Sequence, residues 1–323
     1  MGQSLKITVC TSSGELLPLR PLWEQICANG NYTIFQDFGL NLLAAEKFDD
    51  REQPYVVCAE TPNGAAIIPA VVRHSDNSIR LLGEELFDYR CFLHCGDDQP
   101  LRAALAALAS LGRPLEIVAM RESDRSPVID ELQLLPFAAA PAVCCVDTSA
   151  EQFAAAHTRL ARNLRRLERL GLEPRTYNGA NPRLLRSIYA GKAAQNSSSL
   201  FHDAERIGFL ISAAAFMPEA FEIFTLERNS IMAAGIVTFL DRGFRRFYTG
   251  WFAPEFEKHS PALALIYEIT KQSLATGLDC DYMTGEQPYK MRLATSSVPL
   301  YRVIATPQQL AALDRAQELK AAG

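Results

Sequence analysis

The stretch LDCDYMTGEQPYKMRLA occupies residues 278–294. Its first six residues alternate largely between apolar and acidic side chains, which is typical of a short strand. Gly285 and Pro288 end that pattern, and Tyr289 and Lys290 follow directly. The stretch therefore predicts a strand that ends in a cluster of polar residues, which is either a surface turn or a reaction site.

The residues around this stretch predict a complete α/β unit. Three apolar or alternating segments precede it, and the short turns RNS and DRG between them favour antiparallel hairpins. Asn181-Pro182 and Ser260-Pro261 mark the starts of two helices. The expected order is a strand at 172–177, helices at 182–195 and 203–216, strands at 220–227, 231–240 and 244–252, a helix at 261–276, and strands at 278–283 and 298–305.

The first half of the chain repeats this order of elements. Its expected elements are strands at 5–9, 54–60, 65–73, 78–83, 114–120 and 142–147, and helices at 18–29, 36–48, 100–111 and 126–134. Two copies of one unit follow from this order, although their residues barely match. The predicted fold class is α/β (α+β), with two tandem units, each a mixed, mostly antiparallel sheet flanked by helices.

We expect an N-terminal domain at 1–148, a connecting helix at 149–171, and a C-terminal domain at 172–323 that carries the main motif. The connecting helix has an apolar stripe of Leu160, Leu164, Leu167 and Leu170, and a basic stripe of Arg159, Arg162, Arg166 and Arg169. We interpret the basic stripe as the solvated face of a docked helix. A phosphate or RNA contact is the alternative.

The composition is that of an ordinary globular protein, with 48% apolar residues and a net charge of −5. This charge argues against a chain whose main task is to coat nucleic acid or an anionic membrane. No apolar run approaches the roughly 20 residues of a membrane helix, so we expect a cytoplasmic protein with no membrane span and no DNA partner. Cys91, His94 and Cys95 lack the second ligand pair of a zinc site, and no metal is expected. The oligomeric state stays open.

Residues 244–294 resemble the FemAB-like and CelD/BcsL-like branch of the GNAT acyltransferase superfamily. They contain an aromatic strand, a Ser-Pro helix start, a helix that ends in glycine, an acidic strand, and the pattern Gly-(Asp/Glu)-x-x-Tyr-Lys from Gly285 to Lys290. Gly83 with Asp88-Tyr89 is similar to a Gly-x(4)-Asp-Tyr element of the same branch. The order of elements extends the resemblance over nearly the whole chain and implies two tandem GNAT-like domains.

The resemblance implies a donor site at the start of the helix that follows the aromatic strand. In GNAT enzymes the third and fourth strands splay, and an acyl-CoA lies in the gap with its pyrophosphate at the helix N-terminus. Ser260 and Ala262 would then bind acetyl-CoA or another acyl-CoA. This corner has Glu255 and Glu257 in place of a Gly-rich loop, and FemAB-like enzymes take an aminoacyl group from tRNA, so the donor stays open.

The resemblance also assigns roles to the polar cluster. Tyr289 stands where many GNAT enzymes have a tyrosine that protonates the departing thiolate. Glu286 or Asp281 would accept the proton of the amine. Lys290 and Arg292 would bind substrate. Ring packing is the alternative for Tyr289, and an ordinary helical ion pair with Glu286 is the alternative for Lys290.

Five further residues are substrate-binding candidates, namely Tyr248, Trp251, His259, Asp88 and Tyr89. The first two lie on the aromatic strand, where packing in the core is the alternative. His259 precedes the helix start, where we expect Ser260 to cap the helix. The last two would reach a cleft between the halves, which suits an elongated acceptor.

We expect an N-acyltransferase that acts on an amino group of a sugar, a polysaccharide precursor or another small acceptor. The resemblance implies direct transfer from an acyl-CoA and an association with polysaccharide biosynthesis. Two alternatives stay open. One is FemAB-like transfer from aminoacyl-tRNA, which predicts a basic groove that includes the arginine stripe. The other is a non-catalytic binding module that retains the fold.

Overall fold

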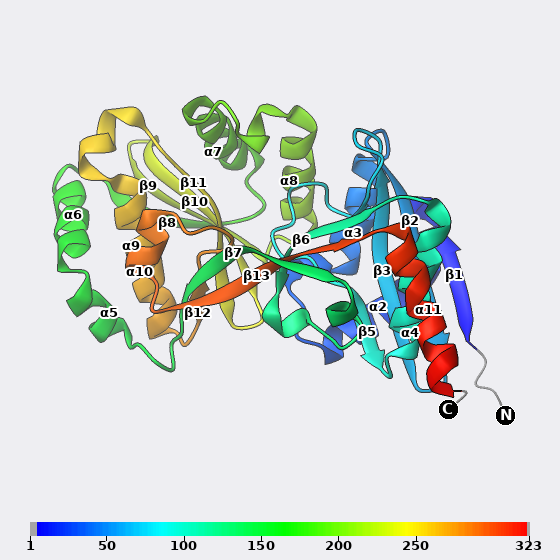
Figure 1. The fold of residues 1–323 in the computed structure, drawn as a ribbon. Helices are drawn as coiled ribbons and strands as arrows, with labels where there is room; N and C mark the ends of the chain where they lie inside the picture. The colour runs from blue at the N-terminus through cyan, green and yellow to red at the C-terminus, as the bar shows by residue number, and fades with distance from the viewer. Residues whose placement is uncertain (1–4, 322–323) are drawn as a thin grey trace. The chain divides into compact units, whose positions relative to one another are not determined.

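The computed structural model describes residues 5–321 of the chain (Figure 1). Contacts divide the chain into two compact units, of which unit 1 is Met1–Ala138 with Pro299–Gly323, and unit 2 is Ala139–Val298. This grouping differs from the expected boundaries at 148 and 172. The expected domain boundaries therefore stay a prediction. The residues that form the C-terminal strand belong to unit 1, although they follow unit 2 in the sequence.

Unit 1 is a sheet with helices on both faces. Its strands are β1 (Lys6–Cys10), β2 (Glu52–Thr61), β3 (Gly64–Arg73), β4 (Ile79–Leu81), β5 (Leu93–Gly96), β6 (Leu115–Arg121) and the later part of β13 (Ser296–Ala305). Its α-helices are α1 (Ser13–Leu16), α2 (Arg20–Asn29), α3 (Phe38–Lys47), α4 (Gln99–Leu108) and α11 (Pro307–Ala321). The strand order is β1-β2-β3-β4-β6-β13, and β5, which the sequence did not predict, pairs with the start of β3.

The alternation of side chains along β2 explains the two helical layers of unit 1. Successive side chains of a strand point to opposite faces of the sheet. Val57 packs in a core cluster with Leu101 of α4, whereas its neighbour Val56 packs in another cluster with Trp23 of α2. Both faces of this sheet are therefore buried, which the nearly continuous apolar runs of β2 and β3 reflect.

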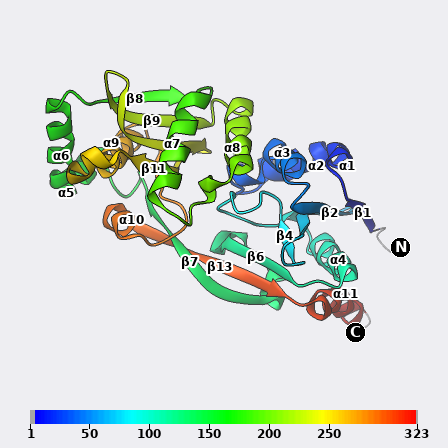
Figure 2. The same cartoon turned by 90° about the horizontal axis from the view of Figure 1, so that it is seen from above.

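Unit 2 has the same kind of sheet (Figure 2). Its strands are the end of β7 (Gln133–Val143), β8 (Glu173–Asn178), β9 (Phe221–Arg228), β10 (Ile231–Asp241), β11 (Phe244–Phe252) and β12 (Asp279–Asp281). Its α-helices are α5 (Ala150–Ala156), α6 (Thr158–Arg169), α7 (Pro182–Gln195), α8 (Ala204–Phe216), α9 (Pro261–Ala275) and α10 (Pro288–Leu293). The order is β7-β12-β11-β10-β9-β8, and only the β11–β12 pair is parallel.

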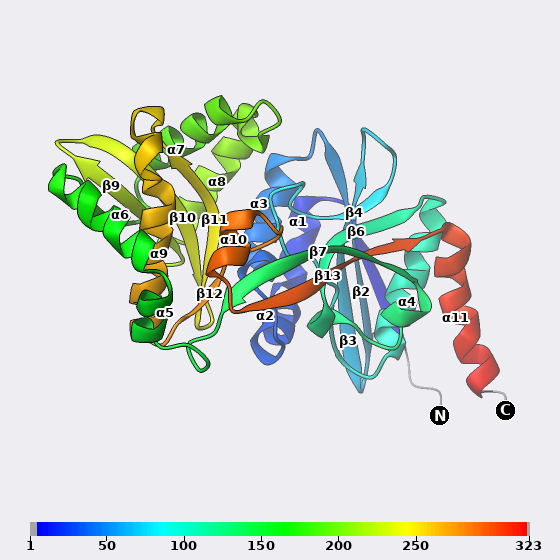
Figure 3. The same cartoon turned by 60° about the vertical axis from the view of Figure 1, so that its left-hand side comes forward.

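The helices α7 and α9 cover opposite faces of the unit 2 sheet (Figure 3). Ile236 of β10 lies in a core cluster with Leu265 of α9. A Cβ built on its neighbour Gly235 would collide with Ile188 of α7, so that helix approaches from the other face. The predicted leucine stripe of α6 is buried in the α9 cluster up to Leu167, which attaches α6 to the outside of α9.

Strand pairing explains the composition of the units. In unit 1, β13 pairs antiparallel with β6, from Leu300 opposite Arg121 to Ala305 opposite Leu115. In unit 2, the end of β7 pairs antiparallel with β12, with Val143 opposite Cys280. Unit 1 therefore receives its last strand from the sequence that follows unit 2, whereas unit 2 is one continuous segment.

Three local predictions are wrong. The segment predicted as a helix at 126–134 contains only a 3-10 turn at Ile129–Glu131, and β7 begins at Gln133 and ends at Val143 instead of running from 142 to 147. A nine-residue helix is marginal without packing, and the apolar run that follows is used by a strand. The connecting helix breaks into α5 and α6 at His157, whose φ of −115° and ψ of 38° are not helical.

Candidate active site

The strands β11 and β12 of unit 2 diverge after a short parallel ladder. The pairs are Phe244 with Asp279, Arg245 with Cys280, and Arg246 with Asp281, and residues 5–321 contain no later pair between these strands. β11 nevertheless continues to Phe252, because β10 pairs with it along the opposite edge. The edge of β11 at 247–252 is thus separated from β12, and α9 connects the two strands.

This geometry corrects the expected position of the splay. The third and fourth strands of the unit are β10 and β11, and they pair from Asp241–Phe244 to Ala234–Phe252. The splay lies between the fourth and fifth strands. Inside the β10–β11 ladder, Val237 faces Thr249 and Thr238 faces Phe247, so Tyr248 forms a β-bulge.

A buried ion-pair network stands where the strands diverge. Arg246 donates from Nε to Asp241 Oδ2 at 2.8 Å and from Nη1 to Asp281 Oδ2. The other oxygen of Asp281 accepts the backbone N–H of Met283 at 2.7 Å. Both carboxylate oxygens of Asp281 are therefore engaged, which fits a structural role better than the expected role of proton acceptor.

The sequence did not predict the importance of Arg245 and Arg246. Their side chains are buried with different partners, because successive residues of a strand face opposite sides. Arg245 binds Glu222 at 2.7 Å and Ser273 at 2.5 Å. The sequence did contain a signal for them, because two charged residues stand inside an apolar and aromatic strand. A charged side chain that is buried in such a strand requires a hydrogen-bond or ion-pair partner.

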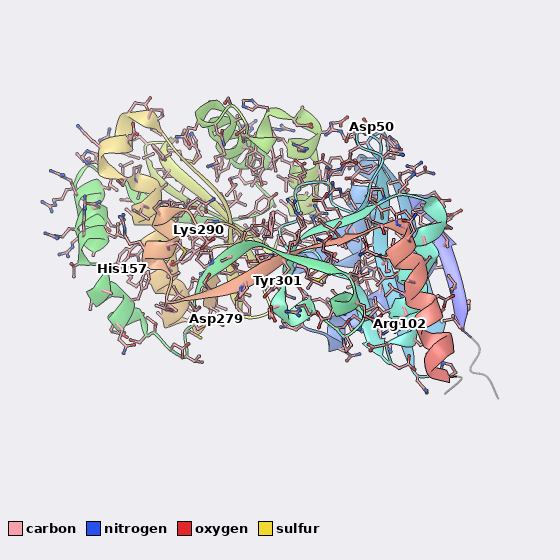
Figure 4. All side chains as sticks on the ribbon, viewed as in Figure 1. Asp50, Arg102, His157, Asp279, Lys290 and Tyr301 are labelled. Atoms are coloured by element: carbon pink, nitrogen blue, oxygen red, sulfur yellow. The ribbon has the colours of Figure 1, made fainter. Side chains whose placement is uncertain are left out.

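Lys290 holds the turn that leads to α10 (Figure 4). Its side chain is only 8% exposed, and Nζ donates to the carbonyl oxygens of Met283 at 3.2 Å and Thr284 at 2.8 Å. The turn needs this support, because Met283 has a positive φ of 60° and Gly285 one of 107°. Lys290 thus acts on the backbone of the turn rather than projecting into solvent.

Tyr289 has the opposite environment. Its side chain is 38% exposed, and partial removal of the ring from water raises the pKa of its hydroxyl. Glu286 and Arg292 are exposed and form no hydrogen bond or ion pair within residues 5–321. These three side chains of the motif are accessible to a substrate, whereas Lys290 and Asp281 are not.

The two aromatic candidates lie on the divergent part of β11. Tyr248 is half-buried at the bulge, and its ring lies 4.8 Å from that of Phe239. Trp251 packs its indole against α7 at Gly191, where a Cβ would collide with the indole nitrogen. Gly191 therefore fixes how closely α7 approaches β11, a role that no sequence pattern indicated.

The N-terminus of α9 faces the corner after β11. Ser260 has a positive φ of 48° and its side chain makes no capping hydrogen bond, so the expected cap is wrong. An N-cap serine usually has extended φ and ψ, which the left-handed conformation precludes. The first intrahelical bond runs from Ala264 N to Ser260 O at 3.0 Å. The N–H groups of Ala262 and Leu263 precede it, and the helix dipole favours an anion there.

The charges around this corner are mixed. Glu255 and Glu257 are exposed on the 3-10 helix Pro254–His259. Burial, followed by Lys258 and Arg166, lowers the pKa of His259, so its imidazole is neutral at pH 7. The Nδ1 atom of His259 is buried and has no hydrogen-bond partner within residues 5–321.

The candidates of unit 1 lie in a different environment. Tyr89 is 1% exposed, its carbonyl accepts the side chain of Gln36 at 2.7 Å, and Arg121 lies 5.8 Å from its ring centroid. Asp88 is half-buried. Tyr89 is a core residue of unit 1, and a direct substrate contact by its ring would require displacement of that core.

Residues 5–321 contain no group of three or more His, Cys, Asp or Glu side chains arranged to hold a metal ion. In the same part of the chain, no helix has both the length and the apolar character of a membrane span.

Several solved structures share the fold of this chain at low sequence identity. The C-terminal domain of a protein named as a lysylphosphatidylglycerol synthetase from Agrobacterium fabrum has a TM-score of 0.62 and 12% identity, with 95% of this chain and 98% of that chain covered. FemX has a TM-score of 0.59 and 10% identity, with 95% of this chain and 99% of that chain covered. A tandem GNAT protein from the clavulanic acid biosynthesis pathway has a TM-score of 0.53 and 11% identity, with 94% of this chain and 99% of that chain covered.

The model of a protein family described as an acetyltransferase (GNAT) domain matches residues 154–291. This chain has a tandem GNAT fold. The match covers the divergent strands, α9 and the Tyr289 motif, which the sequence resemblance had singled out. The curated proteins include no match to this chain. The CelD/BcsL-like branch stays a prediction.

Proposed function

We propose that this chain is an N-acyltransferase that moves an acyl group from an acyl-CoA to an amino group of a sugar, a polysaccharide precursor or another small acceptor. The observation that carries the proposal is the divergence of β11 from β12 ahead of the N-terminus of α9. A cytoplasmic location and a place in polysaccharide biosynthesis belong to the same proposal.

The donor site of this proposal lies along the free edge of β11. The N–H groups of Ala262 and Leu263 and the dipole of α9 suit the pyrophosphate of CoA. The side chain of Ser260 does not cap the helix. Ser260 contributes through its backbone, whose carbonyl oxygen accepts the first intrahelical hydrogen bond of α9. Glu255 and Glu257 are exposed, so their carboxylates can remain in water while the pyrophosphate binds.

Transfer requires one proton donor and one proton acceptor. The amine nitrogen attacks the thioester carbonyl carbon, a C–N bond forms, and the C–S bond breaks. Tyr289 gives its hydroxyl proton to the departing thiolate, and its raised pKa keeps it protonated at pH 7. Glu286 takes the proton released by the amine. Lys290 and Asp281 position the turn that carries Glu286 and Tyr289, since they bind its backbone.

The acceptor would lie against the exposed residues of the motif and the aromatic part of β11. Arg292 supplies a cation for a phosphate or carboxylate of the acceptor. Tyr248 and Trp251 would supply stacking, and His259, which is half-buried, would supply a polar contact. Asp88 and Tyr89 of unit 1 stay predicted substrate-binding residues.

A thermal-shift experiment with acetyl-CoA and longer acyl-CoAs tests the donor. Ligand at 100 times its Kd stabilises a protein by about 2.7 kcal/mol, which raises the melting temperature measurably. The matched variant is Ala262→Asp. Its carboxylate lies where the pyrophosphate would bind and would repel it, but an acidic side chain at a helix N-terminus stabilises the helix. We expect the parent to shift and the variant to keep its own stability without shifting. Equal shifts in both, or none, contradict the donor site.

Aminoacyl transfer from tRNA is the second candidate, and the likeness to FemX favours it at the level of fold. It predicts salt-dependent tRNA binding to a basic groove that includes the α6 arginines. Absence of tRNA binding at low salt removes this candidate.

A non-catalytic binding module is the third candidate, and the acidic residues Glu255 and Glu257 in place of a Gly-rich loop favour it. It predicts ligand binding without turnover. Detectable acyl transfer that depends on Tyr289 removes it.

A further inference from the structure

An arginine ridge runs along the outer side of α6 in unit 2. It consists of Arg159, Arg162, Arg165, Arg166 and Arg169, all exposed. At 100° per residue they lie within an arc of roughly 120°, opposite the buried leucines, and span about 15 Å along the helix. Figures 1 and 2 show α6 at the margin of unit 2, outside α9.

None of the five arginines forms an ion pair within residues 5–321. Two of them donate Nε to backbone carbonyls of their own helix, Arg165 to Ala161 and Arg169 to Arg165, each at 3.3 Å. Most of their N–H groups therefore point to solvent, in a chain whose net charge is −5. The ridge is a local cluster of positive charge on a chain whose overall charge is negative.

Interaction with the helix dipole does not explain why arginines occupy the whole length of the ridge. Cations stabilise the last turn of a helix, where Arg166 and Arg169 lie. Arg159 lies in the first turn, where a cation is unfavourable and where α6 has no acidic residue. The arginines also contribute little to packing, because leucines on the opposite side attach the helix to α9.

We propose that the arginine ridge binds the surface of an anionic phospholipid bilayer. A guanidinium recognises phosphate oxygens with two parallel N–H groups, and a row of them suits an array of headgroups. Because the ridge is the convex outer side of a straight helix, all five side chains reach one plane. Basic residues near an anionic leaflet each add about fivefold to binding.

The chemistry of the ridge fits a bilayer better than RNA. Residues 158–169 contain no aromatic side chain on which the bases of a single strand could stack. A duplex is a cylinder, so a straight convex ridge meets few of its phosphates. The apolar side of α6 is buried in the core, so it cannot insert between lipids, and the binding is electrostatic and sensitive to salt.

Vesicle sedimentation tests the ridge. The full chain is mixed with vesicles of phosphatidylcholine alone or of equal phosphatidylcholine and phosphatidylglycerol, at low and high salt. We expect binding only to the anionic vesicles at low salt. The variant Arg159→Gln/Arg162→Gln/Arg166→Gln is expected to bind on the order of 100-fold more weakly. A control with the same loss of charge is Lys47→Gln/Arg183→Gln/Arg186→Gln, which is expected to bind as the parent does.

Three results overturn the proposal. They are equal binding to both kinds of vesicle, a ridge variant that binds as tightly as the control, and displacement of the parent from anionic vesicles by tRNA at equal phosphate concentration. The last result would assign the ridge to RNA. The test does not involve acyl transfer, so its outcome is independent of the proposed function.

Discussion

At the scale of residues, the neighbours Tyr289 and Lys290 show what the sequence could and could not predict. The pattern Gly-(Asp/Glu)-x-x-Tyr-Lys placed both in one cluster, and both lie at the start of α10. It could not predict that Lys290 turns inward to two carbonyls while Tyr289 stays accessible. Consecutive helical residues point about 100° apart, and only the packing of the turn decides which one is buried.

Tyr289→Phe removes the proposed acid with little change in shape. We expect kcat to fall by about 100-fold, within the range for general acid catalysis, and the melting temperature to stay close to that of the parent. Steady-state turnover with acetyl-CoA measures this. Tyr55→Phe, in unit 1, is the control. Normal turnover of Tyr289→Phe would remove the tyrosine from the mechanism.

Glu52 in unit 1 is a buried carboxyl with consequences for stability. It is 2% exposed, and burial raises its pKa to about 7 against the opposing charges of Arg90 and Arg73. The folded state thus holds the proton more tightly than the unfolded chain, so stability falls as pH rises from the ordinary value of 4.5 to about 7 and is level above it.

The variant Glu52→Gln should lose this pH dependence. We expect it to gain up to about 3 kcal/mol relative to the parent between pH 5 and pH 7.5, measured by urea unfolding at both values. Glu46→Gln, an exposed carboxyl of α3, is the control. Parallel stability curves for parent and Glu52→Gln would show that Glu52 does not titrate in this window.

At the scale of elements, the order of strands and helices in unit 2 could be predicted almost completely, because each element has a clear period and turn residues at its ends. The errors lie in segments whose secondary structure is determined by contacts with other parts of the chain. The segment around Ile129 forms only a 3-10 turn, because β7 includes the residues that follow. The helices α5 and α6 separate at His157, whose ring lies 4.5 Å from that of Phe153.

The turn before α10 depends on one buried cation. Lys290→Met should leave the carbonyls of Met283 and Thr284 without their donor and lower the free energy of unfolding by about 2–3 kcal/mol. Urea unfolding measures the loss. Lys258→Met, an exposed lysine beside His259, should change stability little. Unaltered stability of Lys290→Met would mean that water replaces Nζ and that the turn does not need it.

At the scale of the whole molecule, the two α/β units were predictable but the pairing of β13 with unit 1 was not. The residues of β13 alternate in the same way whichever sheet they join. Its pairing with β6 depends on contacts far apart in the sequence, and Val303 and Ala305 complete the unit 1 core. A boundary drawn from element order alone therefore assigns β13 to the other unit.

Truncation after Val298 should damage unit 1 although the removed residues follow unit 2 in the sequence. The sheet loses one of the two strands that pair with β6, and the core loses Leu310 and Leu313. We expect hydrogen exchange of β2 and β3 to rise far more than that of β9 and β10. Truncation after Asp314, which keeps these residues, is the control. Equal exchange in both pairs of strands would contradict the assignment of β13 to unit 1.

An acyl-CoA should bind where β11 diverges from β12 and α9 begins. Hydrogen exchange measured peptide by peptide, with and without saturating acetyl-CoA or a longer acyl-CoA, tests it most directly. We expect slower exchange at 247–252 and 261–264, and little change in β8 and β9. Slower exchange confined to other segments, or no change with any acyl-CoA, would contradict the proposed donor site.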